Sequence, residues 1–233
     1  MTLRTDLDEA VAKIFRDPWS VTDGVVVPES TDLTLSNTGR SLDATVLYAD
    51  LAASTRLVDG WSREFAAEIY KTFLLVAAKL IRSRGGTITA YDGDRIMAVY
   101  VGKSQSSDAV KTALQLHWAC DNIIQPRLQR QYPTATYSIA HTCGIDHSPV
   151  MAAKTGVRGA NDLVWVGRAA NYAAKLSNES STTPTWITED VYRRLSDETR
   201  YGGDPRQDMW APHLWSSMNN QLVYRSNWHW SLA

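Results

Sequence analysis

The spacing of apolar residues along the chain predicts strands that alternate with helices. Residues 42–49 (LDATVLYA) are typical of a strand. The segment that follows carries apolar residues at helical spacing, namely Phe65, Ile69, Phe73, Val76 and Leu80. Gly85 and Gly86 end this pattern, as glycines commonly do after a helix. The pattern therefore predicts a strand followed by a long helix.

The next segment predicts a hairpin, a second helix and a further strand. Two short strands are expected at 87–91 and 95–101, and the turn Asp92-Gly93-Asp94 between them is of a kind that closes hairpins. A helix begins near Ser107, and residues 135–145 alternate like a half-buried strand. The resulting order, β-α-β-β-α-β, is the ferredoxin-like order. We therefore predict an α+β fold, a two-layer α/β sandwich with a mainly antiparallel sheet.

The two ends of the chain are less regular. Residues 1–40 predict a helical arm followed by loops, because Pro, Gly, Ser and Asp are frequent after the arm. The catalytic domain is expected to span 41–233, including a Trp-rich C-terminal extension. Its last third predicts further elements, in chain order strands near 148–154 and 161–166, a helix over 169–177, and an edge strand at VYRSNWHW.

Composition narrows the class of protein. The 233 residues carry a formal net charge of −1, from 24 basic and 25 acidic side chains. This balance argues against a broad basic face for nucleic acid. The charged N-terminus does not resemble a signal peptide, and no apolar run is long enough to span a membrane. We therefore expect a cytoplasmic protein that binds neither nucleic acid nor membrane, with Cys120 and Cys143 as buried thiols.

Candidate chemistry begins with two aspartates. Asp50 ends the first predicted strand, and Asp94 lies in the hairpin before the third. Each alone could be ordinary turn chemistry. Adjacent strands would bring them together beside the small residues of LAAST (51–55), whose backbone N–H groups could bind phosphates. Such a site suits a triphosphate and two hard divalent cations, Mg²⁺ or Mn²⁺.

Three motifs resemble those of the class III nucleotide cyclases. They are TVLYADLAASTRLVDGW, ITAYDGDRIMAVY and VGRAANYAAKL, in the family's order. The resemblance implies that Asp50 and Asp94 bind the metal ions, with the backbone of Leu51 as a further ligand. It also implies a triphosphate-binding loop, made of Ala52, Ala53, Ser54 and Thr55.

The third motif supplies two further catalytic candidates. Gly167 is followed by Asn171 and then by Lys175, an i, i+4 pair on one helix face. The resemblance implies that Asn171 orients the ribose and Lys175 meets phosphate charge, although the family normally has Arg at the latter position. It also implies a homodimer, in which one subunit supplies the aspartates and the other supplies this pair. The alternative is a solvated helix face.

The base-recognition positions depart from those of adenine-specific cyclases. Ala90 and Val164 stand where such enzymes carry polar side chains, and neither can hydrogen-bond a base. The chain more closely resembles the pyrimidine cyclases of the bacterial Pycsar antiphage system. Tyr48 and Arg95 are then candidates to contact a smaller base. Tyr48 shares the face of Asp50, whereas alternation places Arg95 on the other face unless the hairpin bends; a core aromatic and a surface salt bridge are the alternatives.

The resemblance implies cyclisation of UTP to 3′,5′-cyclic UMP and pyrophosphate, with UTP favoured over CTP. It also implies a role in antiviral defence and a separate effector that responds to the cyclic nucleotide. Three alternatives stay open: cyclisation of CTP, cyclisation of ATP or GTP, and a catalytically silent nucleotide-binding sensor domain.

Overall fold

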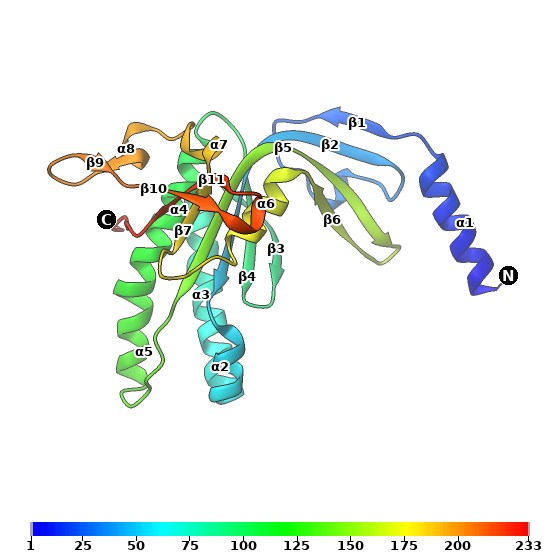
Figure 1. Cartoon of the computed structure of the whole chain (residues 1–233). Helices are drawn as coiled ribbons and strands as arrows, with labels where there is room; N and C mark the ends of the chain where they lie inside the picture. The colour runs from blue at the N-terminus through cyan, green and yellow to red at the C-terminus, as the bar shows by residue number, and fades with distance from the viewer. Residues whose placement is uncertain (1, 233) are drawn as a thin grey trace.

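One mixed sheet runs through the molecule (Figure 1). The computed structural model describes residues 2–232, and within them the sheet has nine strands, with the order β10-β11-β7-β5-β2-β4-β3, β1 beside β2 and β6 beside β5. The strands are β1 Ser20–Asp23, β2 Thr38–Leu51, β3 Thr87–Asp92, β4 Arg95–Tyr100, β5 His141–Val157, β6 Ala160–Val166, β7 Thr185–Thr188, β10 Ala211–Trp215 and β11 Gln221–Ser226. A separate small sheet pairs β8 Tyr201–Gly202 with β9 Gln207–Asp208.

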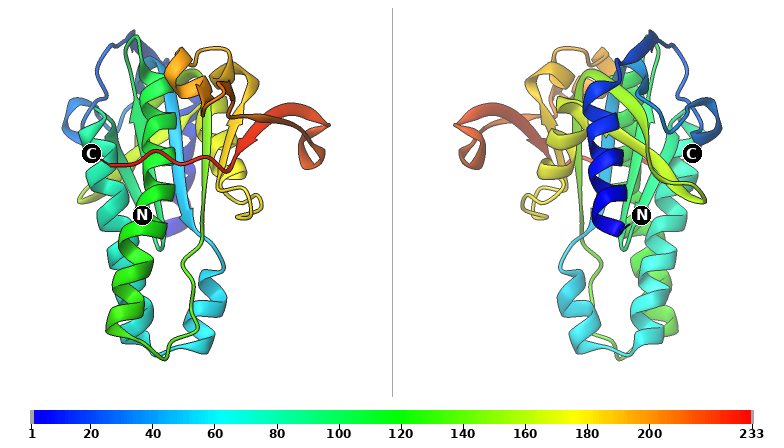
Figure 2. Two further views of the ribbon diagram at one scale, coloured as in Figure 1. Left: turned by 90° about the vertical axis from the view of Figure 1, so that its left-hand side faces the viewer. Right: turned by 90° about the vertical axis from the view of Figure 1, so that its right-hand side faces the viewer.

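Helices cover both faces of this sheet (Figure 2). They are α1 Leu3–Arg16, α2 Ser54–Gly60, α3 Arg63–Ser83, α4 Gln105–Ala119, α5 Gln125–Gln131, α6 Arg168–Leu176, α7 Glu189–Tyr192 and α8 Asp197–Arg200, with short turns η1 Ser30–Asp32, η2 Cys120–Ile124 and η3 Ser216–Met218. Alternate residues of β2 face opposite ways: Leu47 joins the core under α3 and α4, and Val46 joins the core under α6.

The order β5-β2-β4-β3, with α3 and α4 on one face, confirms the predicted α+β ferredoxin-like core. All three strand pairs of this core are antiparallel. Parallel pairing occurs outside it, between β1 and β2 and between β5 and β7. The predicted long helix is also present: the Ser62 hydroxyl accepts from the Phe65 N–H at the start of α3, and Gly85 follows its end with φ of +73°.

The strand after α5 corrects the prediction of separate strands at 135–145 and 148–154. β5 is a single strand that begins at His141, and residues 135–140 precede it. The polar run Asp146-His147-Ser148 lies in the middle of this strand and is buried. Its side chains have partners on neighbouring elements, so they do not interrupt the strand.

Short elements also differ from the expectation. The stretch after α1, expected to be loop, contains β1, whose four residues are all exposed and so show no apolar alternation. α2 follows directly from the small-residue loop. In the tail, the edge strand is β10, and β11 lies between β10 and β7 and ends at Ser226. Trp230 continues beyond it and donates its N–H to the carbonyl oxygen of Leu114, 3.0 Å away.

The two cysteines lie in the core, as predicted. Cys120 and Cys143 are free and buried, and burial raises the pKa of both thiols. Among residues 2–232, no helix has the length and apolar character that crossing a bilayer requires. The division of the chain into an arm of residues 1–40 and a catalytic domain stays a prediction.

Candidate active site

The end of β2 and the start of β4 position the acidic residues. Asp50 is the next-to-last residue of β2, and its partner in the antiparallel register is Arg95, the first residue of β4. Asp94 directly precedes Arg95, in a turn that Gly93 makes with φ of +61°. Burial is the main cause that raises the pKa of Asp50, and the negative charge of Asp94 adds to it. The chain thus places both predicted metal aspartates at one end of the sheet.

Arg95 corrects the orientation expected from alternation. Its Nη2 lies 3.1 Å from Asp50 Oδ2 and donates to Asn178 Oδ1 at 2.9 Å. Its guanidinium carbon is 5.9 Å from the centre of the Tyr48 ring. Residues that face each other across an antiparallel pair share one side of the sheet, so the pairing with Asp50 brings Arg95 to the face of Tyr48 and Asp50. The alternation argument failed because it started from Asp94, which lies in the turn.

Burial dominates the electrostatics of this site. It raises the pKa of Asp50, an effect that the hydrogen bond and the charge of Arg95 oppose and the charges of Asp94 and Asp92 reinforce. Burial also raises the pKa of Tyr48, while the charge of Arg95 lowers it. The acidic groups therefore lie in a partly dry environment with one cation, Arg95, bound directly to Asp50.

An unpartnered carboxylate oxygen marks where a cation would fit. Asp94 Oδ2 is buried and has no hydrogen-bond partner within the described part of the chain. Carboxylate oxygens are preferred ligands of Mg²⁺ and related hard cations. Residues 2–232 contain no cluster of three or more His, Cys, Asp or Glu side chains arranged for a metal ion. Asp50 and Asp94 therefore fit a divalent cation only if backbone or substrate oxygens complete its coordination.

The loop after Asp50 turns sharply into α2. Leu51 is buried, and the N–H of Ala52 donates to the carbonyl oxygen of Ala140 at 2.8 Å, so this N–H is not available for phosphate. Ala53 adopts a left-handed conformation with φ of 56°. Ser54 and Thr55 open α2, where the first N–H groups of a helix lack partners in a preceding turn. The predicted triphosphate loop thus retains backbone donors only after Ala52.

Asn171 and Lys175 lie together on α6. Both are exposed, whereas Ala169, Ala173 and Leu176 of this helix pack on the sheet. The Lys175 ammonium is 3.3 Å from the sulfur of Met218. In the described part of the chain, no polar contact joins Asn171 or Lys175 to Asp50 or Asp94. Within one chain, the pair on α6 and the two aspartates are therefore not joined directly.

The two positions that correspond to base-recognition residues of adenine-specific cyclases lie on different strands. Ala90 lies on β3 beside a bulge and pairs with Met97 near the aspartates. Val164 lies on β6, pairs with Ala153 and is exposed. A single chain therefore places only Ala90 near Tyr48 and Arg95.

Two neighbours of this site were not identified from the sequence. Asn178, just after α6, holds Arg95, and no local motif signals that role. Tyr137 lies before β5; burial is the main cause that raises its pKa to about 12, and the charge of Asp94 contributes. The Tyr137 hydroxyl, like Asp94 Oδ2, is buried without a partner in the described residues.

Known proteins are similar to this chain in fold and in sequence. No protein-family model matches the chain. The adenylyl cyclase CyaB from P. aeruginosa superposes with a TM-score of 0.67 over 84% of this chain and 99% of that chain, at 17% identity. The fold, with paired aspartates where β2 and β4 meet, is thus that of a class III nucleotide cyclase.

Sequence comparison is more specific. The uridylate cyclase from Xanthomonas perforans is 47% identical over 233 residues, which cover 100% of both chains. The uridylate cyclase from Burkholderia cepacia is 46% identical over 234 residues, again 100% of both chains. The chain belongs to the uridylate cyclase family.

Proposed function

We propose that the protein converts UTP into 3′,5′-cyclic UMP and pyrophosphate. The ribose 3′-hydroxyl loses its proton and its oxygen bonds to the α-phosphorus, while the bond from that phosphorus to the oxygen of the leaving pyrophosphate breaks. The observation that carries the proposal is the placement of Asp50 and Asp94 beside Tyr48 and Arg95. This arrangement combines carboxylates for the triphosphate end with an aromatic ring and a cation for a base.

Divalent cations have a defined place in this proposal. Asp50 and Asp94, with the backbone carbonyl of Leu51, would hold two of them, Mg²⁺ or Mn²⁺. When bound, the cations would activate the attacking oxygen and stabilise the charge that develops on the leaving group. The unpartnered oxygen of Asp94 supports this role, because a buried carboxylate oxygen otherwise lacks a counterpart. Ser54 and Thr55 would donate backbone N–H groups to the phosphates.

Base recognition would fall to Tyr48 and Arg95. A pyrimidine ring is smaller than a purine, and the Tyr48 ring would fill the remaining space. The Arg95 guanidinium carries only donors, which suits the two carbonyl oxygens of uracil. Arg95 is bound to Asp50 in the free chain, so a cation at Asp50 would compete for that carboxylate and release the guanidinium. Metal binding at Asp50 would thereby be coupled to base recognition by Arg95.

A homodimer would complete the site. Asn171 and Lys175 are exposed, and within the described residues neither makes a polar contact with Asp50 or Asp94. In the proposed dimer, these two residues reach the nucleotide that the partner's aspartates hold. Lys175 would supply one positive charge, without the planar fork that an Arg presents to two phosphate oxygens. Each dimer would then contain two composite sites.

The product fits a signalling role. A cyclic nucleotide acts by binding another protein, so we propose a separate effector and, from the resemblance to the Pycsar cyclases, a role in antiviral defence. Nucleoside triphosphates are made and used in the cytoplasm, which is the compartment we propose.

The test is product identification by mass. Purified protein is incubated with Mn²⁺ and each of UTP, CTP, ATP and GTP, and Asp50→Ala serves as the inactive control. We expect cyclic UMP from UTP and little product from the others. Cyclic CMP, AMP or GMP as the main product would contradict the base assignment, and no product from any of the four would contradict the catalytic proposal.

A further inference from the structure

One face of β5 packs closely against α6. Gly144, Asp146 and Ser148 alternate along the strand and so point the same way. A Cβ atom on Gly144 would lie 2.1 Å from the carbonyl oxygen of Ala173, so the helix backbone rests directly on the strand. Near the start of α6, the Ser148 hydroxyl accepts the N–H of Ala169 at 2.9 Å. The strand thus contacts the helix near both of its ends.

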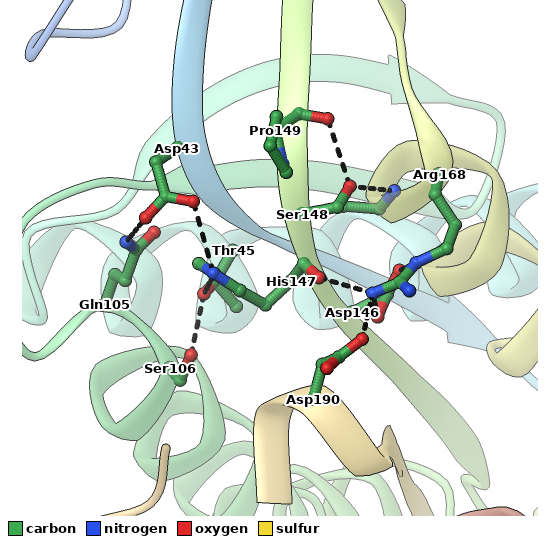
Figure 3. Close-up of polar contacts among 11 residues, drawn as sticks. Asp43, Thr45, Gln105, Ser106, Asp146, His147, Ser148, Pro149, Arg168 and Asp190 are labelled. Atoms are coloured by element: carbon green, nitrogen blue, oxygen red, sulfur yellow. Dashed lines mark hydrogen bonds and ion pairs between the residues drawn. The ribbon is translucent and has the colours of Figure 1, made fainter. Parts of the chain in front are cut away.

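An ion pair with a buried carboxylate lies between these two contacts (Figure 3). Asp146 is 0% exposed, and its carboxylate accepts from Arg168 Nε at 3.0 Å and from Arg168 Nη2 at 3.2 Å. The Thr188 hydroxyl donates to the same carboxylate. A two-point contact between a guanidinium and a carboxylate fixes direction as well as distance. Arg168 is the first residue of α6, so the pair fixes the start of that helix.

Arg168 has further partners that restrict what it can do. Its Nη2 donates to the carbonyl oxygen of His147 at 2.7 Å and also contacts the carboxylate of Asp190 on α7. Figure 3 shows the guanidinium between Asp146 and Asp190. A cation held by two carboxylates has no excess positive charge with which to attract a phosphate. Arg168 is therefore better suited to holding α6 than to contacting the nucleotide.

The helix that this pair holds carries both catalytic candidates. Asn171 and Lys175 follow Arg168 by three and seven residues, so all three lie along one side of α6. We propose that Asp146 and Arg168 are positioning residues, whose ion pair fixes the rotation of α6 and its position along β5. The pair thereby orients Asn171 and Lys175 towards the nucleotide that the partner's aspartates hold. This inference rests on the proposed function, because it assigns those two residues to the reaction.

The first test distinguishes an effect on the position of α6 from an effect on UTP binding. Asp146→Asn preserves shape and an acceptor oxygen but removes the charge that holds Arg168. Because misplacement by about 1 Å can cost roughly a hundredfold in rate, we expect kcat to fall about 10- to 100-fold while KM for UTP changes by less than about threefold. The matched control is Asp197→Asn, at an exposed aspartate that does not contact Arg168, and it should lower kcat by less than about threefold. Equal kcat values for Asp146→Asn and wild type would overturn the proposal.

A second variant tests the proposal in case Asp146→Asn does not fold. Arg168→Lys keeps a cation beside the buried carboxylate but loses the two-point contact. We expect a folded dimer by circular dichroism and light scattering, with kcat reduced and KM nearly unchanged. A folded Arg168→Lys dimer with wild-type kcat would also overturn the proposal.

Mixing experiments assign the defect to one half of the composite site. Asp146→Asn chains are mixed with Asp50→Ala chains, whose α6 is intact, and separately with Lys175→Ala chains. We expect activity to recover only in the first mixture, because one site of that heterodimer combines intact aspartates with an intact α6. When Asp50→Ala and Lys175→Ala chains recover activity on mixing, recovery of Asp146→Asn only with Lys175→Ala, or in neither mixture, would show that Asp146 does not act through α6.

The control for these mixtures is Asp50→Ala with Lys175→Ala. Failure of this control, with subunit exchange verified by mass, would count against the shared site of the proposed function. The kcat values of the Asp146→Asn and Arg168→Lys homodimers would then still decide whether the ion pair positions α6.

Discussion

Asp94 has a buried carboxylate oxygen that meets no donor in the described residues, close to two other acidic groups. Such an arrangement costs stability in the free chain and is typical of functional residues. We expect Asp94→Asn to lower turnover of UTP at least about 10³-fold, because a metal ligand is lost. We expect the melting temperature to stay the same or rise, since the repulsion with Asp50 is relieved. Steady-state kinetics and thermal unfolding, with exposed Asp8→Asn as control, measure both.

An opposite pattern would argue against a metal-binding role. If Asp94→Asn lowered the melting temperature by several degrees and kept full activity, Asp94 would be a structural turn residue. The sequence suffices to find both aspartates, because each lies within a motif that combines a strand end with a turn.

The contact between Arg95 and Asp50 could not be predicted from the sequence motif. Its side chain reaches Asp50 only because the register pairs these two residues, and that register depends on the turn at Gly93. For Arg95→Gln we expect kcat/KM for UTP to fall about 10- to 100-fold, as expected when a polar contact to the base is lost. Exposed Arg130→Gln serves as control. An unchanged ratio of UTP to CTP use, with unchanged kcat/KM for UTP, would remove Arg95 from base recognition.

At the scale of elements, α6 is expected to act in trans. Chains carrying Asp50→Ala and chains carrying Lys175→Ala should each be inactive as homodimers. Mixed, they should recover about a quarter of wild-type activity, because random exchange makes half of the dimers mixed and each mixed dimer retains one of two sites. Titrating one variant into the other at constant total protein measures this recovery. Activity that stays at the level of the single variants after verified exchange would contradict a shared site.

Elements differ in how far local sequence determines them. α3 is predictable because its apolar stripe, its Ser62 cap and the glycine after its end agree with one another. β5 is not, because its buried polar residues look like a break unless their partners are known. His147 is an example: its ring contacts the Thr45 hydroxyl at 3.2 Å and Asp43 at 3.3 Å, both on β2. Those contacts come from residues about a hundred positions away, which no local pattern reports.

On the scale of the whole molecule, a buried histidine links stability to pH. Burial and the charge of His117 lower the pKa of His141 to about 3, from an ordinary value near 6.5. The folded protein therefore favours neutral His141, while the unfolded chain binds a proton below pH 6.5. The stabilisation is complete above pH 6.5 and is lost as the pH falls from 6.5 towards 3.

This linkage predicts a measurable difference between variants. Between pH 7 and pH 5, wild type should lose roughly 2 kcal/mol more free energy of unfolding than His141→Gln, which lacks the titrating group. Urea unfolding at several pH values measures this, and exposed His229→Gln should behave like wild type. Parallel pH profiles for wild type and His141→Gln would show that His141 already titrates normally in the fold.

The order of strands and helices was predictable from residue 42 to residue 145, although the last strand of this stretch begins only at His141 and continues to Val157. The additional strands were not, since β1 has no apolar alternation and β10 lies at the edge only because β11 pairs with β7. The proposed composite site could not be derived from local patterns either, because no polar contact joins Asn171 or Lys175 to Asp50 or Asp94 among the described residues.

The buried cysteines give the folded protein a further property. Thiol oxidation and alkylation need an accessible thiolate, and burial both shields Cys120 and Cys143 and raises their pKa. The two thiols of the folded cyclase should therefore resist oxidants and maleimides, and its activity should be independent of the thiol redox state of its surroundings. Modification of either cysteine then reports that the molecule has opened, so alkylation rate measures its unfolding.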